Sequence, residues 1–469
     1  MNSLEFNKKK IYSEASGTMA VVDSNIKMTL NDHGLYEETL VDKTKEISRA
    51  AELVSPNLNG NVNESIIADQ LFKTQQGIDF DERIGYFNSL YVGHVDEDDY
   101  RKEASSGGFG TWILKELFVN DLVDYVIHVK KNTDNNSAIM FKYDISNSLS
   151  EIKNGAKTKY YPVELSEVMQ KVKECPGRYV VVGIPSFIYA IRLLCKEDSI
   201  INDRIKYTVG LICGHQKSSK FAESMAWQVG IKPGDLKEID FRHKLLNKPA
   251  NQYGIKLRGL VDGKDTTIVK ENSELYGQNW GWGLFKPTAS NFTDDVFNET
   301  ADIVLGDAWL PKYTSDSKGN NIIIIRNSEI NSLVSNALNE KRLMLDSVDV
   351  ETIFNSQISH YRHTHDELAY RLFIQDQLQT WRPDKRVKAS KKFSKFRKEV
   401  QDLRISISEY SHIEYQRAVE KENFEYFITH LSKYTDKYTK IYLYHNRINM
   451  IKEIGITGIV KKVWNKLGK

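Results

Sequence analysis

The sequence predicts an α/β core with a largely parallel or mixed sheet, preceded by a short polar N-terminal region and followed by an α-helical C-terminal region. Between about residues 84 and 345, apolar runs such as "RYVVVGIP" alternate with helical runs such as "SFIYAIRLLCK". Strands that are apolar throughout and separated by helices are typical of a parallel sheet covered on both faces. Beyond residue 346, charged segments carry apolar residues at helical spacing, as in "DELAYRLFIQDQLQTW". We therefore expect three regions, 1–80, 81–345 and 346–469.

Composition and charge argue against several classes of protein. The 469 residues are 40% hydrophobic, and 65 Lys and Arg against 63 acidic residues give a net charge of +2. This balance carries no signal for specific nucleic-acid binding. No secretion leader is evident, and the most apolar stretch, 179–195, contains Pro185 and Arg192 and falls short of the roughly 18 to 20 residues of a membrane span. We expect a cytoplasmic protein.

Cysteines and histidines predict no metal site. The three cysteines, at positions 175, 195 and 213, form no CxxC pair, so the sequence supports neither a disulfide framework nor a four-thiolate cluster. The segment "SHYRHTHDE" offers His360, His363 and His365 beside Asp366. On a helix the first two of these histidines are neighbours but His365 turns away, so we expect no bound metal.

The segment "RKEASSGGFGTWILKELF" (101–118) is the strongest local signal for a ligand. Ser105, Ser106, Gly107 and Gly108 precede an amphipathic helix and can present hydroxyls and backbone amides at its positive end, where a phosphate would bind. The structural alternative is an N-cap with a flexible entry to the helix.

Two predicted strands end in turns that suit a pocket wall. The run "VVVGIPSFIYAIR" ends its strand at Gly183, Pro185 and Ser186, and "ADIVLGDAWLP" ends at Gly306 and Asp307. Ligands of open α/β sheets lie beyond the carboxyl ends of the strands. A glycine permits close backbone approach there, and an acid can accept hydrogen bonds from a ligand hydroxyl. Ordinary turns remain the structural alternative for both.

Basic segments suggest contacts with anions. In "DFRHK", Arg242 and Lys244 share one side of a predicted strand and suit a phosphate or a carboxylate. The run "DKRVKASKKFSKFRK" (384–398) and the end "IGITGIVKKVWNKLGK" (454–469) could lie on an anionic membrane or meet a polyanion. Solvated faces are the alternative in each case.

Seven segments, taken in order, resemble the beta-subunit family of the factor 420 (deazaflavin) hydrogenases and dehydrogenases. They span about residues 84–326 and read "GYFNSLYVGHV", "RKEASSGGFGTWIL", "AKTKYYP", "VVGIPSFIYAIR", "GLICGHQKSS", "DFRHK" and "ADIVLGDAW" with "GNNIIIIR". The resemblance implies a flavoprotein that holds FAD and passes reducing equivalents between a deazaflavin or another donor, the flavin and iron–sulfur clusters. Relatives also occur among bacterial surface-polysaccharide biosynthesis proteins. By the same resemblance, the flavin-pocket candidates are Ser105, Ser106, Gly107, Gly108, Lys159, Tyr160, Gly183, Pro185, Ser186, Gly306 and Asp307.

The sequence departs from this family where iron–sulfur ligands are expected. Ser186 stands where relatives carry a cysteine, and "SNFTDD" supplies Ser290, Thr293 and Asp295 in place of a C-x-x-C-x-D segment. Many relatives begin with a ferredoxin-like domain whose two cysteine runs have gaps of two, two and three residues. In this chain those runs fall on Ser13, Ser16, Met19 and Asp23, then on Lys45, Ser48, Ala51 and Ser55. We therefore expect a degenerate ferredoxin-like region without iron–sulfur clusters, because clusters need thiolates.

The leading hypothesis is a FAD-dependent oxidoreductase that moves a hydride from a nicotinamide, NAD(P)H, or deazaflavin donor to an organic substrate, in surface-polysaccharide biosynthesis. Residues 105–108 would cradle the diphosphate, Asp307 would fix a flavin hydroxyl, Arg242 or Lys244 would hold an anionic group, and Tyr160 is the candidate acid. The substrate would be a small, sugar-derived molecule.

Two alternatives stay open. The first is a non-redox binding protein or pseudoenzyme in a glycan-assembly complex, with the basic C-terminal region docking on a partner or on the inner face of the membrane. The second is a transferase that uses the phosphate loop for a nucleotide sugar.

Overall fold

An eight-stranded mixed sheet forms the centre of this computed structural model, which describes residues 1–60, 62–134, 137–213 and 215–467, with side chains as far as residue 452. The strand order is β15-β5-β14-β13-β9-β8-β6-β7. Pairings along β13-β9-β8-β6 are parallel, and the other four pairings are antiparallel. The strands are β5 (Ser89–Val95), β6 (Tyr125–Lys131), β7 (Phe141–Ser146), β8 (Tyr179–Gly183), β9 (Ile205–Leu211), β13 (Ile303–Asp307), β14 (Asn321–Ile325) and β15 (Leu343–Ser347).

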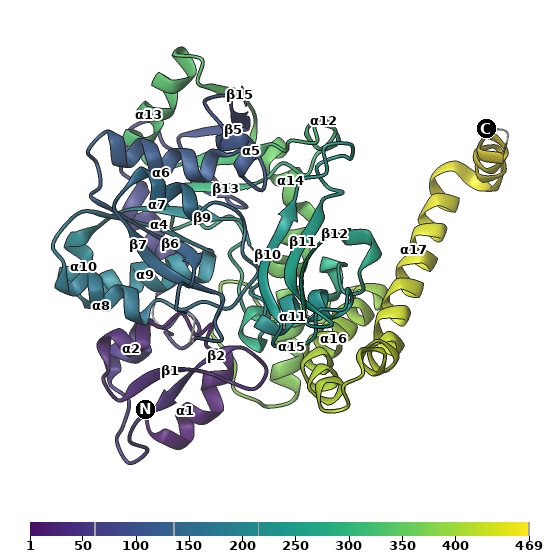
Figure 1. Cartoon of the computed structure of the whole chain (residues 1–469), viewed down its shortest axis with the longest axis horizontal. Helices are drawn as coiled ribbons and strands as arrows, with labels where there is room; N and C mark the ends of the chain where they lie inside the picture. The colour runs from purple at the N-terminus through teal and green to yellow at the C-terminus, as the bar shows by residue number, and fades with distance from the viewer. Residues whose placement is uncertain (61, 135–136, 214, 468–469) are drawn as a thin grey trace.

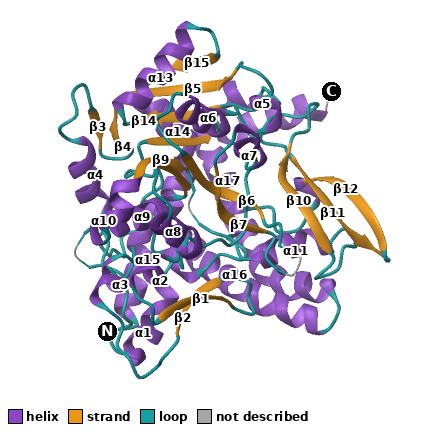
Figure 2. Cartoon of the chain, turned by 60° about the vertical axis from the view of Figure 1, so that its left-hand side comes forward, coloured by secondary structure: helices purple, strands orange, loops and turns teal. Residues whose placement is uncertain are grey.

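Helices cover both faces of this sheet, as the apolar strands require (Figure 2). In β14, Ile323 and Ile325 pack with the helices of one layer, and Ile322 and Ile324 pack with those of the other, since side chains alternate along a strand. The first layer contains α6 (Phe109–Val119), α7 (Leu149–Asn154) and α13 (Ser328–Asn339). The second contains α8 (Ser166–Glu174), α9 (Pro185–Glu197), α10 (Ser199–Arg204) and α14 (Val350–Tyr361).

A second body of structure packs beside the sheet around an antiparallel three-stranded meander (Figure 2). Its apolar side chains form a separate core with α11 and the long C-terminal helices, and α17 extends away from the rest of the chain (Figure 1). The elements are β10 (Leu236–His243), β11 (Gly254–Val261), β12 (Lys264–Glu271), α11 (Ser219–Trp227), α16 (Lys395–Glu420) and α17 (Phe424–Leu467). Between them lie α15 (Leu368–Gln377), a π-helical turn (Arg362–Asp366), α12 (Pro311–Thr314) and short 3-10 turns at Asn272–Glu274, Trp280–Trp282 and Thr288–Asn291.

The N-terminal region is small and packs onto the helices α8 and α9. Met19 and Ala51 are buried in the same core as one face of the central sheet. Its elements are α1 (Ser3–Lys9), a 3-10 turn (Lys10–Tyr12), α2 (Thr18–Val22), β1 (Ile26–Leu30), β2 (Tyr36–Leu40), α3 (Arg49–Leu53) and α4 (Glu64–Phe72). The hairpin β3 (Asp79–Asp81) and β4 (Gly85–Phe87) and the short helix α5 (Tyr100–Glu103) complete the chain.

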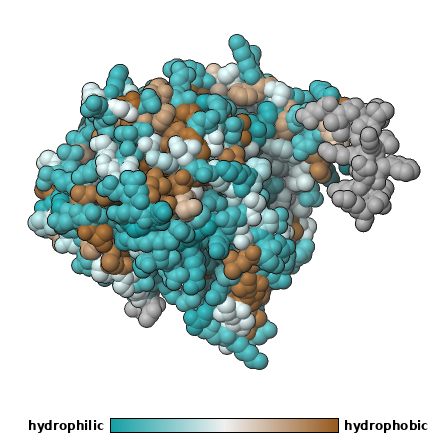
Figure 3. Space-filling model, turned by 90° about the horizontal axis from the view of Figure 1, so that it is seen from above, coloured by the Kyte–Doolittle hydropathy of each residue, from teal (hydrophilic) through white to brown (hydrophobic). Residues whose placement is uncertain are grey.

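The expected α/β core and helical C-terminal region are confirmed, with a sheet that is mixed. Strand β15, the last strand of the sheet along the chain, ends at Ser347. In the part of the chain that the structure describes, we find no helix both long enough and apolar enough to cross a membrane. The face seen in Figure 3 is mainly hydrophilic, with apolar residues scattered over it in small groups.

One buried arginine ties two segments to the end of β14. Arg326 is 0% exposed, and its guanidinium donates hydrogen bonds to the carbonyl oxygens of Ile84, Tyr86, Phe297, Asn298 and Ala301. Buried carbonyl groups need donors, because water cannot reach them. Arg326 therefore fixes the β4 hairpin and the loop before β13 in one position.

Replacing Arg326 with Met should lower the free energy of unfolding by at least about 3 kcal/mol, because several buried carbonyl oxygens lose their donor together. Chemical denaturation followed by tryptophan fluorescence measures the change. The matched control is Arg258→Met in β11, whose ion-pair partners Glu238 and Asp265 are about as exposed as the arginine itself. It should lose less than about 1 kcal/mol, and an equal loss in both variants would contradict the assignment.

Candidate functional site

A cavity of about 300 Å³ lies at the carboxyl ends of the parallel strands. Gly183 ends β8, Leu211 ends β9 and Asp307 ends β13, and all three residues line it. The first turn of α6 and the segment 155–161 supply further walls. The strand ends that the sequence singled out therefore meet around one space, the place where open α/β sheets bind ligands.

The loop before α6 borders this cavity through Ser105, Ser106 and Gly108. The Ser105 hydroxyl accepts a hydrogen bond from the backbone N–H of Thr158 (2.9 Å), and the Ser106 hydroxyl donates to the Asn320 carbonyl (2.9 Å). Gly108 has φ +90°, and a Cβ there would lie 2.7 Å from the backbone nitrogen of Arg101, so only glycine fits. The hydroxyls of this loop therefore hold neighbouring segments in place.

Gly107 is a packing glycine at the start of the same helix. A Cβ on it would lie 2.7 Å from the Asn321 Oδ1 atom and 2.7 Å from the Gly93 carbonyl oxygen. The Asn321 side chain also accepts a hydrogen bond from the N–H of Phe109 (3.3 Å), one of the free donors of the helix. The sequence suggested that a phosphate binds at this helix end. The Asn321 side chain, however, already accepts a hydrogen bond from one of the free N–H groups of the helix.

Of the three residues predicted at the turn after β8, only one lines the cavity. Gly183 lines the cavity, and its carbonyl oxygen accepts a hydrogen bond from the Asn298 side chain (3.0 Å). Pro185 occupies the first turn of α9, and Ser186 beside it is buried. Neither is among the described residues that line the cavity, whereas Ile184 and Phe187 of the same turn are.

Lys159 and Tyr160 line the cavity side by side in sequence. The Lys159 ammonium donates to the carbonyl oxygens of Gly155 (2.5 Å) and Ala156 (2.6 Å), and burial lowers its pKa to about 7. The Tyr160 hydroxyl lies 3.4 Å from Arg242 Nη1. Burial raises the pKa of Tyr160 far above its usual value, so the phenol keeps its proton at neutral pH.

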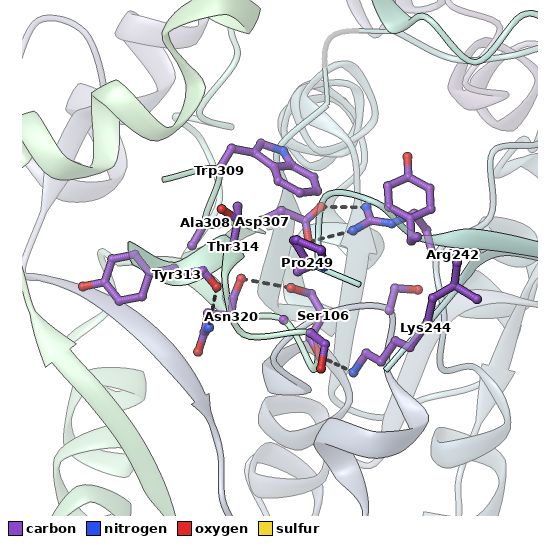
Figure 4. A pocket seen from close by; sticks show the side chains of 16 residues that line it. Ser106, Arg242, Lys244, Pro249, Asp307, Ala308, Trp309, Tyr313, Thr314 and Asn320 are labelled. Atoms are coloured by element: carbon purple, nitrogen blue, oxygen red, sulfur yellow. Dashed lines mark hydrogen bonds and ion pairs between the residues drawn. The ribbon is translucent and has the colours of Figure 1, made fainter. Parts of the chain in front are cut away.

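Arg242 and Asp307, to which the sequence gave separate roles, form an ion pair with each other. Arg242 Nη1 lies 2.8 Å from Asp307 Oδ2, and Nη2 lies 3.3 Å from Oδ1. The guanidinium carbon is 4.1 Å from the ring centre of Tyr253 and 5.2 Å from that of Trp309. Figure 4 shows the pair where the meander strand β10 approaches the end of β13. The carboxylate is therefore already engaged by a buried cation.

Lys244 lies near Arg242, as the alternation in "DFRHK" predicted, and the two residues line a small pocket next to the cavity (Figure 4). Its ammonium donates to the carbonyl oxygens of Arg101 (2.5 Å) and Ser106 (2.8 Å). Burial lowers the pKa of Lys244 to about 7. Gly306 also borders the cavity, where a Cβ would lie 2.7 Å from the Ile212 side chain.

Sequence reasoning missed three residues near the cavity. His215 and Lys217 line it, and the Trp280 ring lies 4.6 Å from the ring of Tyr160 and 4.7 Å from the Lys217 ammonium. The segment "GLICGHQKSS" contains the first two, but no charge pattern marked them. Trp280 lies in a 3-10 turn that comes near Tyr160 and Lys217 only through the tertiary fold.

Comparison with family models decides the assignment of this chain. Residues 90–170 match the N-terminal model, and residues 177–351 the C-terminal model, of the coenzyme F420 hydrogenase/dehydrogenase beta subunit. The chain belongs to this family. Both matched segments contribute walls to the cavity. Residues 352–469, with most of the C-terminal helices, lie outside the matched segments.

A search of solved structures found a chain of the F420-reducing nickel–iron hydrogenase complex from Methanosarcina barkeri, determined as a xenon derivative. It is 13% identical, covers 63% of this chain and 96% of that chain, and gives a TM-score of 0.47. A search of curated proteins gave no match.

A polar network lies close to positions where the family resemblance led us to expect cluster cysteines. Glu14 lies between Ser13 and Ser16, and its carboxylate accepts hydrogen bonds from Ser290 (3.2 Å) and Gln216 (3.3 Å). Ser290 stands in the segment where the resemblance implies a cysteine pair, and Gln216 lies three residues after Cys213. Segments far apart in sequence therefore converge here, and burial raises the pKa of Glu14 to about 7.

The histidines considered for metal make other contacts. His363 Nδ1 lies 3.3 Å from the Glu367 carboxylate, and the His365 ring stacks on Tyr361 at 4.5 Å. His360 is on α14, and burial lowers its pKa to about 4. Among the described residues, no three His, Cys, Asp or Glu side chains come together as metal ligands would.

Glu14 should give the protein a measurable pH dependence of stability. Its carboxyl has a folded pKa raised from 4.5 to about 7, so the folded state binds the proton more tightly and stability falls as pH rises from about 4.5 to about 7. Glu14→Gln removes this loss. The stability of the variant minus that of the wild type should grow over this interval, by up to about 3 kcal/mol.

Thermal melts of both proteins between pH 5 and 8 measure this difference. Glu5→Gln, on the exposed helix α1, is the control and should give a difference that grows little above pH 5, because its folded pKa is lowered from 4.5. A constant offset for Glu14→Gln across the range would show that Glu14 ionises normally.

Proposed function

We propose that this chain is a FAD-dependent oxidoreductase that moves a hydride from a nicotinamide or deazaflavin donor to an organic substrate without iron–sulfur clusters. One observation carries the proposal: a member of this family has a partly open cavity at the carboxyl ends of its parallel strands, with apolar walls and basic side chains. Bound there, FAD would supply the hydride chemistry.

The walls of the cavity fit the two halves of such a cofactor. Val182, Ile184, Leu211 and Ile212 offer apolar surface for a flat ring system. The basic side chains suit a diphosphate, and in the described part of the chain Asp307 is the only acid among the lining residues. These basic side chains are Lys157, Lys159, Lys217 and Arg242.

Tyr160 is the candidate catalytic residue in this proposal. Its phenol keeps its proton, so it can donate a hydrogen bond to a substrate oxygen that gains negative charge when a hydride arrives. Arg242, 3.4 Å away, would stabilise a phenolate if the proton is transferred. The Arg242–Asp307 pair keeps this cation at the cavity wall.

We also propose that residues 1–80 derive from a ferredoxin-like domain. The Asp23 carboxylate, at the fourth position of the first run, accepts a hydrogen bond from the backbone N–H of Ser48 in the second run (2.7 Å). In two-cluster ferredoxins the fourth cysteine of one run serves the other cluster, so contacts between the runs are the expected arrangement. This supports a domain that kept its shape after losing its ligands.

A role in surface-polysaccharide biosynthesis on the cytoplasmic side of the membrane is part of the proposal. In the basic run 384–398, Lys385 and Arg386 are engaged with Asp294 and Glu299, while Lys388, Lys391 and Lys392 are exposed. Side chains of the second basic segment, 454–469, lie outside the described residues. Peripheral attachment would therefore use the exposed lysines of the first run.

A glycine in α6 gives a sharp test of cofactor binding. Gly110 lines the cavity, and a Cβ there meets only the Leu305 side chain, at an ordinary 3.7 Å. Gly110→Ala should fold and retain the flavin, because alanine fits and favours the helix. Gly110→Leu should fold but lose most of its flavin, because the longer side chain fills the cavity. Visible absorbance near about 450 nm of purified, FAD-supplemented protein measures this.

The spectra also separate the alternatives. A wild-type protein that stays colourless with added FAD would reject the flavin proposal. Thermal-shift screening with NAD(P)H and nucleotide sugars would then test the binding-protein and transferase alternatives, since a ligand of the folded state raises stability. Equal flavin content in Gly110→Leu and wild type would place the flavin elsewhere.

A further inference from the structure

A group of buried cations without acidic partners in the described ranges lies beside the part of the cavity that Cys213, His215, Gln216 and Lys217 form. Lys217, Lys286 and Arg404 are 3%, 5% and 7% exposed. Their charged ends donate only to neutral oxygens: Lys217 to the Leu284 carbonyl (2.6 Å), Lys286 to the Asn291 side chain and Arg404 to the Gly281 carbonyl. In the described ranges, none of the three has a carboxylate oxygen within 4.0 Å.

All three cations act on one imidazole that borders the cavity. Burial, and then the charges of Lys217, Lys286 and Arg404, lower the pKa of His215 far below its usual value, so the ring is neutral. His215 Nε2 is buried and has no hydrogen-bond partner among the described residues. A neutral imidazole can carry its proton on this nitrogen and donate it to a ligand.

Burying a cation without a counter-ion costs free energy, and for the two lysines this cost appears as a lowered pKa. Burial lowers the pKa of Lys217 to about 7 and that of Lys286 well below its usual value. Glu14 acts on Lys286, but its own carboxyl titrates near pH 7 because of burial. An anion beside these amines would keep them charged, and nothing in the described part of the protein supplies one with a full charge.

The size of the positive charge indicates a phosphate rather than a carboxylate. A phosphate monoester carries about −1.5 to −2 at pH 7 and offers three acceptor oxygens, whereas a carboxylate carries one charge. Two lysines, an arginine and one imidazole donor match the phosphate in charge and in number of donors.

We propose that His215 and Lys217, supported by Lys286 and Arg404, bind the phosphate group of a phosphorylated organic substrate. This inference rests on the proposed function, because it places the substrate in the same cavity as the flavin. The Trp280 ring lies between the proposed phosphate site and the candidate acid. Its centre is 4.7 Å from the Lys217 ammonium and 4.6 Å from the centre of the Tyr160 ring. A phosphate held by Lys217 is therefore one aromatic ring away from the candidate acid.

Titration with inorganic phosphate tests the site directly. Isothermal titration calorimetry of the full-length protein at pH 7, at constant ionic strength in chloride, should show binding. Lys217→Met should weaken it by about tenfold or more, because one charge-assisted hydrogen bond is lost. Lys264→Met, on the exposed strand β12, is the control and should bind as the wild type does. If Lys217→Met does not fold, Arg404→Met takes its place.

A second arm distinguishes the substrate's phosphate from that of the cofactor. The titration is repeated with FAD-loaded protein and with a hexose 1-phosphate as probe. Binding of both probes to FAD-loaded protein supports the inference. Loss of phosphate binding on FAD loading would assign the cations to the cofactor's diphosphate and overturn it, as would unchanged binding in Lys217→Met and Arg404→Met. A protein that takes up no FAD but binds phosphate would reject only the flavin proposal.

Discussion

The ion pair between Arg242 and Asp307 holds the site together. It joins β10 of the meander to the end of β13 in the central sheet, two bodies that have separate apolar cores. Burying a guanidinium costs several kcal/mol unless a carboxylate accompanies it. Because the same two side chains line the cavity, the contact that joins the two bodies also forms one of its walls. The ion pair thus helps to form a partly open binding space at the ends of the parallel strands.

The second constraint is the loss of thiolate ligands. In the space where Glu14, Gln216 and Ser290 meet, hydrogen bonds between side chains now hold segments that are far apart in the sequence. Hydrogen bonds can replace metal ligands as structural links, but they carry no electrons. The oxidoreductase we propose therefore depends on the direct approach of donor and substrate to one cavity, and not on electron transfer through clusters to a partner.

Much of the core could be predicted because its signals are local. The run from Tyr179 to Glu197 is apolar enough to indicate a strand followed by a helix, and the rule for strand ends brought Gly183 and Asp307 to the same cavity. Pairings between distant residues could not be predicted. Arg242 and Asp307 are 65 positions apart, so each looked available for a ligand. Lys385 and Arg386 looked like part of a solvated basic run, although both have acidic partners.

Arg404 comes from α16, outside the segments that match the family models, while most of the cavity wall lies within them. Of the four side chains in the proposed phosphate site, Arg404 would then come from outside the matched segments, while His215, Lys217 and Lys286 lie within the C-terminal match. Selection could exchange the C-terminal helices and so change which phosphorylated compound is accepted, while the parallel strands and their turns stay as they are.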